Sequence, residues 1–312
     1  MVSLPHGKRF AFSVLDDTDN ANVANVGPIY ALFRELGMRT TKTVWPLDCD
    51  PQERGIFEGS QTLQDPEYAD FVRELVANGF EIASHNATMV SSERSRTVEG
   101  LEVLRSTFGS VPKIHCNHSQ NRENLYWGAN RYTNRTIRML ARGFGAVSGR
   151  STFEGDDPAS PYYWADLCER NFRFVRNFTF SRLDTSRLPP GGPYRRQDMP
   201  GIGYWFTTSD ASDAVAFKRL FTRPRIDRLV RDGGVCILST HLAAEYVVDG
   251  KVDSEIEATL RYLASFDGWF APVSEILEHM LSARGEDGIT PMQLFRLESA
   301  HVLDRLKGLV SG

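Results

Sequence analysis

The sequence places carboxylates and imidazoles in a pattern suited to metal or acid–base chemistry. An apolar run, FAFSVL at residues 10–15, ends in Asp16 and Asp17, and Asp19 follows two positions later. Four histidines share one feature, a place at the end of another apolar run: His85, His115, His118 and His241. One carboxylate with two imidazoles is a ligand set that suits zinc and leaves a position open for water. A second carboxylate can then act as general base and a histidine as general acid.

Each of these residue types also has an ordinary structural interpretation. Paired Asp residues after a strand often cap a helix or a turn, and we expect Asp19 to form such a turn with Asn20. A lone His at a strand end is more often a hydrogen-bonded core residue than a ligand. Both types at the ends of several strands favour a functional site, because the strand ends of a βα protein meet on one face.

Segments of two kinds alternate along the chain. Predicted strands cover residues 10–15, 40–46, 80–85, 113–118, 146–149, 171–180 and 235–241, and predicted helices cover 26–37, 67–79, 94–109, 134–145, 213–233 and 254–266. This pattern is typical of repeated βα units. Seven or eight such units favour a barrel, with an open doubly wound sheet as the alternative. The Pro- and Gly-rich stretch 182–203 is predicted to be a long loop near the site.

Composition excludes several classes of protein. The 312 residues carry 36 basic and 40 acidic side chains, a formal net charge of −4 that favours neither nucleic acid nor an anionic membrane surface as partner. The sequence has no apolar stretch long enough to span a membrane and no secretory signal, so we expect a cytoplasmic protein. Four scattered cysteines without CxxC spacing indicate neither a zinc ribbon nor a disulfide scaffold.

Several motifs together resemble those of the polysaccharide deacetylases, carbohydrate esterase family 4 with the NodB-homology fold. SVLDDT resembles the family's strand end TFDDG, GFEIASH resembles GHEIGSH, and VCILSTH resembles the closing strand that presents a histidine. ELGMRTTKTVW and GWFAPVSEIL resemble the family's second and last units. The resemblance implies an α/β protein, an irregular (β/α)7-type barrel at residues 8–280, with 281–312 as a C-terminal helical extension.

The resemblance also implies roles for the matching residues. Asp16 is expected to be the general base, Asp17 and His85 metal ligands, and His241 the general acid. The cofactor is expected to be a divalent metal, zinc first, with cobalt, nickel or manganese as alternatives.

Two departures from the family pattern concern the third ligand and an arginine. The family's second motif carries another ligand four residues after the first, and that position is Met89 here. The stretch KIHCNHSQNREN stands where the family has an Arg that orients its catalytic Asp. We therefore expect His118 to supply the missing metal ligand, with His115 as second choice.

Polar residues near these strand ends are candidates for substrate binding. They are His115, Asn117, Asn86, Asn121, Arg122, Trp127, Lys42 and Arg176. Lys42, expected on the inward face of a barrel strand, would need a carboxylate partner, and Asp16 is a candidate for it.

The function predicted on this basis is metal-dependent removal of an N-acetyl or related acyl group from a small carbohydrate or glycoside. The alternatives are a related barrel hydrolase that cleaves another C–N or glycosidic bond, and a non-catalytic carbohydrate-binding barrel that has lost the metal. Residues 281–312 are expected to pack on the barrel or on a second subunit, which would make a homo-oligomer.

Overall fold

A closed barrel of seven parallel strands forms the centre of the computed structural model, which describes residues 3–147, 152–285 and 288–311. The strands are β1 (Phe10–Asp16), β2 (Thr41–Val44), β3 (Glu81–Ser84), β4 (Ile114–His115), β5 (Phe174–Phe180), β6 (Tyr204–Asp210) and β7 (Val235–Thr240). Neighbours in sequence are neighbours in the sheet, and the pairing of β1 with β7 closes it. The predicted (β/α)7 barrel is therefore confirmed.

Strand β1 has three partners, which makes it the seam of the barrel. One edge pairs with β7 from Ala11 to Asp16. The other edge is divided between β10 (Gly268–Phe270), which pairs with its first half, and β2, which pairs with Leu15 and Asp16. The end of β1 therefore has a strand on both sides, which fixes the backbone of the acidic residues there.

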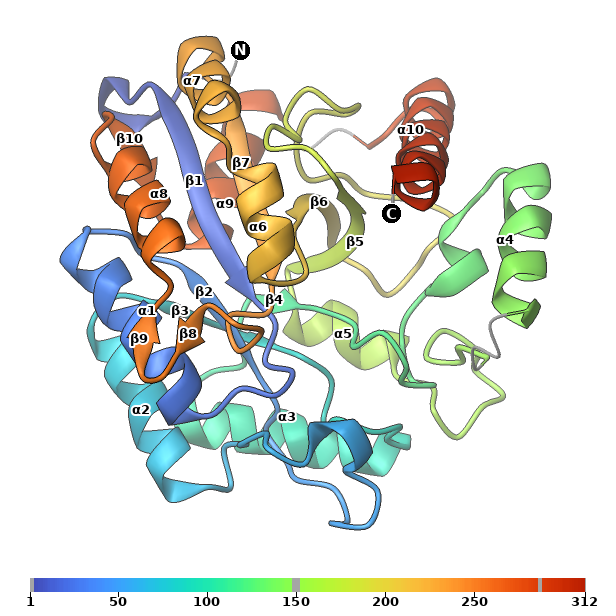
Figure 1. Ribbon diagram of the computed structural model, residues 1–312. Coiled ribbons are helices and arrows are strands. Elements are labelled where there is room, and N and C mark those ends of the chain that lie inside the picture. Colours follow the sequence, from blue (N-terminus) through green and yellow to red (C-terminus); the bar gives the residue numbers. More distant parts are fainter. Residues whose placement is uncertain (1–2, 148–151, 286–287, 312) are drawn as a thin grey trace.

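Helices cover the barrel on the outside (Figure 1). They are α1 (Val23–Glu35), α2 (Pro66–Ala77), α3 (Arg94–Phe108), α4 (Arg135–Val147), α5 (Ala165–Asn171), α6 (Ala214–Leu220), α7 (Arg223–Asp232), α8 (Ser254–Ala264), α9 (Val273–Arg284) and α10 (Pro291–Ser311). Three short 3-10 helices are η1 (Pro5–Gly7), η2 (Gly55–Phe57) and η3 (Gly128–Arg131), and a small antiparallel pair joins β8 (Val247–Val248) to β9 (Lys251–Val252).

Three sequence predictions need correction. Residues 146 and 147 of the predicted strand 146–149 belong to α4, and its last two residues lie outside the described part of the chain. The predicted helix 213–233 is two helices, because Pro224, in the first turn of α7, cannot continue the backbone hydrogen bonds of α6. Strand β6 was missed, since it directly follows the irregular stretch 182–203.

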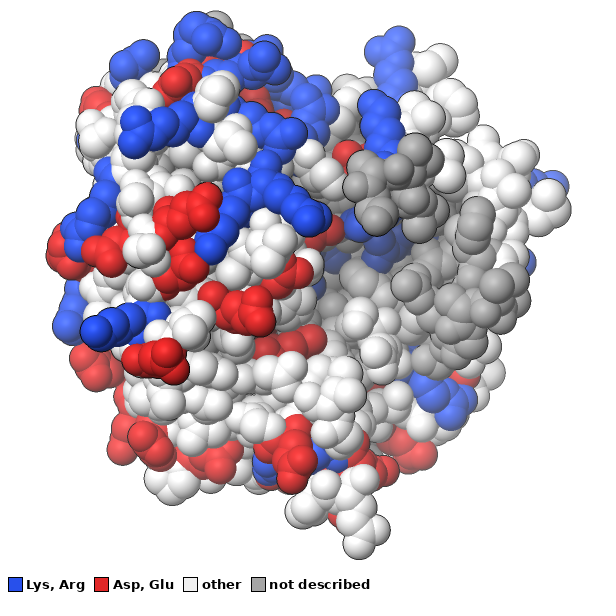
Figure 2. Space-filling view, viewed as in Figure 1, with Lys and Arg blue, Asp and Glu red and all other residues white. Residues whose placement is uncertain are grey.

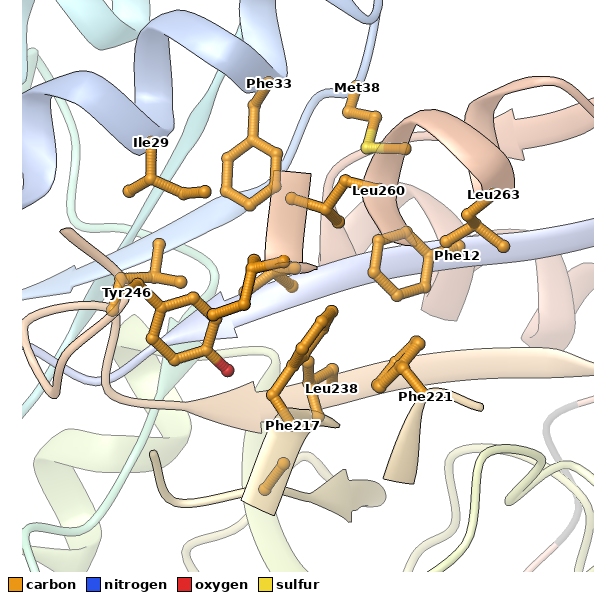
Figure 3. Close-up of a cluster of buried hydrophobic side chains, with 14 of the residues drawn as sticks. Phe12, Ile29, Phe33, Met38, Phe217, Phe221, Leu238, Tyr246, Leu260 and Leu263 are labelled. Atoms are coloured by element: carbon orange, nitrogen blue, oxygen red, sulfur yellow. The ribbon is translucent and has the colours of Figure 1, made fainter. Parts of the chain in front are cut away.

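Alternation along β1 assigns its side chains to two cores. Phe10, Phe12 and Val14 face outward into a cluster with α1, α6, α7 and α8, whereas Ala11 and Leu15 belong to a separate cluster inside the barrel. In the outer cluster Phe12 meets Leu260 and Leu263 of α8, with Ile29 and Phe33 of α1 close by (Figure 3). The same alternation continues into the acidic end of the strand.

The C-terminal helix α10 is tied to the barrel and to the start of α4. Its Leu297 packs in the core cluster that includes Val175 and Phe178 of β5. Its buried Glu298 accepts hydrogen bonds from the backbone N–H groups of Thr133 (2.6 Å) and Asn134 (3.1 Å), just before α4. Helices α4 and α10 thus form one side of the molecule, opposite α1, α2 and α8 (Figure 1).

The face shown in Figure 2 carries acidic and basic side chains interspersed, in keeping with the small net charge. Among the residues that the structure describes, no helix is both long and apolar enough to cross a membrane.

The replacement Phe12→Ala should lower the free energy of unfolding by about 3–5 kcal/mol, because it opens a cavity between β1 and its covering helices. Urea denaturation measures this change. The matched control Val215→Ala removes a side chain that is 48% exposed on α6 and should change stability by at most about 0.5 kcal/mol. Equal effects of the two variants would contradict this assignment of the core.

Candidate metal and catalytic site

The three carboxylates at the end of β1 point to three different places. Asp16 continues the outward face of Phe12 and Val14, and Asp17, whose N–H donates to Thr240 O (2.8 Å), continues the inward face. Asp19 follows in a turn in which Ala21 N–H donates to Thr18 O (2.9 Å). The three groups therefore have different partners.

Asp16 is fully buried, and hydrogen bonds occupy both of its oxygens. Oδ2 accepts from Lys42 Nζ (2.8 Å) and Tyr30 OH (2.9 Å), and Oδ1 accepts from the backbone N–H of Leu242 (2.9 Å). The predicted general base is therefore a structural group, because it has neither exposure nor a free oxygen with which to reach a water.

Lys42 is the buried counter-charge of Asp16, and the pairing considered from the sequence is present. Its ammonium group also lies 5.8 and 5.9 Å from the ring centroids of Tyr30 and Tyr68, between the barrel and the helices. Burial lowers the pKa of Lys42, but Asp16 and Tyr68 together raise it above its usual value. The expectations that Lys42 faces inward and contacts substrate are wrong, since the ammonium is sealed beneath α1 and α2.

Asp17 lies inside the mouth of the barrel, where Arg176 holds it. Arg176 Nη1 donates to Oδ1 (2.8 Å) and Oδ2 (2.6 Å) of Asp17 and to Ser239 Oγ (2.6 Å). Arg176 was predicted to contact substrate, but its guanidinium orients a carboxylate instead. Asp17 does not belong to the group of possible metal ligands found among the described residues, in contrast to its expected role.

The carboxylate that meets the imidazoles is Asp19. Its Oδ1 lies 3.1 Å from His85 Nε2 and its Oδ2 lies 3.3 Å from His118 Nε2, and the ligand atoms of these three residues all lie within 4.8 Å of one another. Two ligands at about 2.1 Å from one tetrahedral zinc are about 3.4 Å apart, so this spacing suits a metal. Asp19 lies in the turn with Asn20 that the sequence predicts, and its carboxylate in addition faces the two imidazoles.

Hydrogen bonds hold both imidazoles with Nε2 toward Asp19. His85 Nδ1 lies 3.0 Å from the carbonyl oxygen of Cys116, which can only accept, so Nδ1 carries the proton. His118 Nδ1 lies 2.9 Å from Asn121 Oδ1, whose NH₂ group donates to Thr88 O and Val90 O. His118 Nε2 is buried and has no hydrogen-bond partner. This orientation leaves the lone pairs of both Nε2 atoms available to a cation, with a second shell that fixes the rings.

Electrostatics at Asp19 also favour a cation. Burial raises the pKa of Asp19, but the three surrounding imidazoles of His118, His241 and His85 hold it well below its usual value. Burial lowers the pKa of His118, and the partnership with Asp19 raises it overall. Positive charge is thus favourable between these groups, and a divalent cation would supply it there.

His241, the predicted general acid, follows β7 and faces Asp19 from the other side. Its Nδ1 donates to Ser212 O (2.8 Å), and its Nε2 lies 3.6 Å from Asp19 Oδ2. Burial lowers the pKa of His241, but the hydrogen bond to Asp19 and the charges of Asp17 and Asp19 raise it to about 9. The side chain is 30% exposed, against 2% for His85 and 1% for His118, so it is the imidazole that a substrate can reach.

The asparagines predicted to bind substrate instead support the His118 loop. Asn86 Oδ1 accepts from His118 N–H (3.0 Å), and Asn117 accepts from Leu125 N–H (3.1 Å) and donates to Leu125 O (3.0 Å). Asn121 holds the His118 ring. These three side chains are at most 5% exposed, so their polar atoms serve the protein and not a sugar.

Glu123 is a site residue that the sequence interpretation missed. Its buried carboxylate accepts hydrogen bonds from Asn86 Nδ2 (2.8 Å), Asn121 Nδ2 (2.8 Å) and Ser92 N–H (3.0 Å). Burial raises its pKa, although these three donors act in the opposite direction. Glu123 thus fixes the two asparagines that position His118. Its place in the loop after β4, two residues from Asn121, was the available signal.

His115 and Met89 are core residues. His115 is fully buried between Trp164 and Phe172, with its ring centroid 4.9 and 5.2 Å from theirs, so it neither ligates with this group nor contacts substrate. Met89 packs with Trp45 and Phe57, whose rings lie near His118. The family's ligand position therefore contributes to an apolar wall here.

Arg122 and Trp127 lie farther along the same loop. Arg122 pairs with Glu154 (2.8 Å) and stacks over the Tyr162 ring at 4.4 Å. Trp127 lies beneath the guanidinium of Arg131. Neither residue belongs to the group around Asp19. Their contact with substrate stays a prediction.

Comparison with solved structures identifies the fold as that of the polysaccharide deacetylases. The chain is similar to a protein from Mycobacterium smegmatis assigned as a polysaccharide deacetylase (TM-score 0.54, 14% identity, covering 93% of this chain and 96% of that one). It is also similar to one assigned in the same way from Pseudomonas aeruginosa PAO1 (0.55, 14%, 90% and 94%) and to the Puue allantoinase (0.53, 14%, 90% and 93%). No family model and no curated protein sequence matches the chain. It is therefore a divergent member of this fold.

Replacement of Asp16 should act on stability more than on chemistry. Asp16→Asn leaves the ammonium of Lys42 buried without a counter-charge and should cost about 3–5 kcal/mol of unfolding free energy, measured by urea denaturation. The double variant Asp16→Asn/Lys42→Met removes both charges and should recover most of that loss. Full stability of Asp16→Asn together with lost turnover would instead restore Asp16 as the base.

His115 should make the fold sensitive to acid. Burial lowers its pKa to about 3, so below about pH 6.5 the unfolded chain binds a proton that the folded chain does not. The contribution of neutral His115 to the free energy of unfolding is fully present above that pH. It decreases as the pH falls, by about 2 kcal/mol at pH 5. When the pH is lowered from 7 to 5, the free energy of unfolding of His115→Gln should fall by about 2 kcal/mol less than that of the wild type, measured by urea titration. Equal losses would show that His115 is charged in the folded state.

Proposed function

We propose that this protein is a metal-dependent hydrolase that removes an N-acetyl or related acyl group from a carbohydrate-like substrate. The observation that carries the proposal is the convergence of Asp19, His85 and His118, with each imidazole held through Nδ1 so that Nε2 faces the same point. The fold supports it, because two of the similar solved structures are assigned as polysaccharide deacetylases.

Asp19, His85 and His118 would hold the metal. One carboxylate oxygen and two imidazole nitrogens suit zinc first, and cobalt, nickel or manganese as alternatives. A bound divalent metal polarises an acyl carbonyl and acidifies a water molecule. The second shell, Cys116 O for His85 and Asn121 for His118, maintains the tautomer that each ligand needs.

Asp17 is the carboxylate suited to the general base. It faces into the barrel mouth, its Oδ1 lies 4.0 Å from His85 Nδ1, and Arg176 fixes its orientation without protonating it. The guanidinium holds the Asp17 carboxylate in place, and a carboxylate so placed is suited to accept a proton from water. Arg176 of β5 thus orients Asp17. In the family that the sequence resembles, an arginine from another segment orients the catalytic aspartate.

His241 is suited to donate a proton to the departing amine. Its Nδ1 is engaged by Ser212 O, so the proton on Nε2 is the one presented to the site. Its side chain is 30% exposed, which lets the leaving group approach.

Hydrolysis of another C–N bond is the second candidate, because the Puue allantoinase shares the fold at a similar TM-score. Glycoside hydrolysis is disfavoured, since it needs two carboxylates facing each other across about 5–9 Å. Here Asp16 is sealed under the helices and points to the opposite face of β1 from Asp17.

Metal binding tests the ligand set directly. The wild type should bind about one zinc per chain by calorimetry, and Asp19→Ala, His85→Ala and His118→Ala should each weaken binding by at least about 100-fold. His279→Ala, which removes a histidine away from the site, is the matched control and should bind as the wild type does. If Asp19→Ala binds zinc as tightly as the wild type does and Asp17→Ala does not bind it, Asp17 is the ligand.

Roles in turnover follow from the same set of variants. Asp17→Asn should keep the metal and lose at least about 100-fold in kcat on N-acetylated sugars, because the base is missing. Assays with both N-acetylated sugars and allantoin as substrates distinguish removal of an acyl group from hydrolysis of another C–N bond. Sugar binding without metal and without turnover would leave the non-catalytic barrel as the function.

A further inference from the structure

Arg131 is the last residue of η3, and in the part of the chain that the structure describes no acidic side chain pairs with it. Its guanidinium carbon lies 3.8 Å from the ring centroid of Trp127 and 5.6 Å from that of Phe178 on β5. Its Nε is buried without a hydrogen-bond partner. Within residues 3–147, 152–285 and 288–311 its side chain forms no ion pair.

Three carboxylates, those of Asp198, Asp210 and Glu298, are already engaged by other groups. Glu298 accepts from the N–H groups of Thr133 and Asn134 and lies 3.8 Å from Arg196, and Asp198 pairs with Arg196 at 2.8 Å. Asp210, at the end of β6, pairs with Arg305 at 3.1 Å. None of these groups neutralises Arg131.

Arg305 of α10 adds a second positive charge beside the same aromatic cluster. Its Nε donates to His301 Nε2 (3.3 Å), and the His301 ring lies 4.5 Å from Phe178. Arg305 is 48% exposed, so its ion pair with Asp210 leaves part of the guanidinium open to water. In Figure 2, Lys or Arg side chains are set back in the hollow between the barrel and the side that carries α4 and α10.

The local field is positive. Burial lowers the pKa of Arg131 to about 10, and the charges of Arg305 and Arg176 add to this effect. Burial and the charges of Arg131 and Arg305 also hold the pKa of His301 well below its usual value. Arg131 is partly buried, and a cation that is partly removed from water without a counter-ion is costly, so a bound anion would relieve that cost. Arg is suited to this role because its planar group can donate to two oxygens at once.

We propose that Arg131, assisted by Arg305, binds an oxyanion, the phosphate or carboxylate group of the substrate. Arg131 packs on Phe178 of β5, and the same strand carries Arg176, which holds Asp17, so the anion site and the catalytic centre share a strand. The substrate would then be an anionic carbohydrate, an inference that rests on the proposed function. The anion site itself does not depend on turnover.

Direct binding of inorganic phosphate tests the site. Calorimetry on the full chain without added metal should show saturable binding that weakens at least tenfold in Arg131→Met and is partly kept in Arg131→Lys. Arg135→Met, which removes an exposed arginine at the start of α4, is the matched control and should bind as the wild type does. Glucuronate as a second titrant distinguishes a carboxylate from a phosphate preference.

Two results would overturn the proposal. One is a wild type that binds neither phosphate nor glucuronate, and the other is Arg131→Met binding as tightly as the wild type. Because Arg131 packs on Trp127, melting temperatures of all variants are compared. Arg305→Gln offers a second variant that leaves that stacking intact and should weaken phosphate binding at least threefold.

Kinetics then connect the site to the substrate. With zinc bound, the wild type should show a KM at least tenfold lower for N-acetylglucosamine 6-phosphate than for N-acetylglucosamine, and Arg131→Met should abolish that difference while kcat changes little. An equal loss on both sugars would show a structural role for Arg131 and contradict the proposal. Phosphate binding through Arg131 without turnover of either sugar would uphold the anion site and refute the proposed function.

Discussion

The buried ion pair between Asp16 and Lys42 is the constraint on which the top of the barrel depends. A charged pair removed from water is stable only if every remaining polar atom is satisfied, and here Tyr30 and the backbone N–H of Leu242 complete the set. One carboxylate thus joins β1, β2, α1 and the segment that follows β7. Since Leu242 is the neighbour of His241, the pair also fixes the position from which that imidazole faces the site.

The division of roles among the three aspartates follows from the geometry of a strand. Side chains alternate, so the bulky outward residues Phe12 and Val14 place Asp16 with the helices and Asp17 with the barrel interior. This alternation is visible in FAFSVLDD. It could have predicted that two adjacent aspartates point to opposite faces of the strand and cannot both reach one metal ion. The assignment by motif treated the pair as a unit, whereas the structure buries Asp16 with Lys42 and places the carboxylate of Asp19 beside His85 and His118.

The barrel, its strand order and the meeting of His85, His118 and His241 at one face could be predicted from the sequence, because hydrophobic periodicity and strand-end position are local signals. The supporting groups could not. Asn121 and Glu123 act through contacts that form only when the loop after β4 folds back on Thr88 and Ser92. Burial of Met89 with Trp45 and Phe57 likewise depends on the loop that carries η2. Residue type alone does not distinguish such groups from substrate contacts.

The order of the strands has a consequence for how the protein is made. Asp19, His85 and His118 all lie in the first four strand units, whereas Arg176 and His241 come from β5 and the segment after β7. During synthesis, the three residues suited to hold a cation therefore leave the ribosome before Arg176 and His241. The complete group at the barrel mouth forms only when β7 joins β1 and closes the ring.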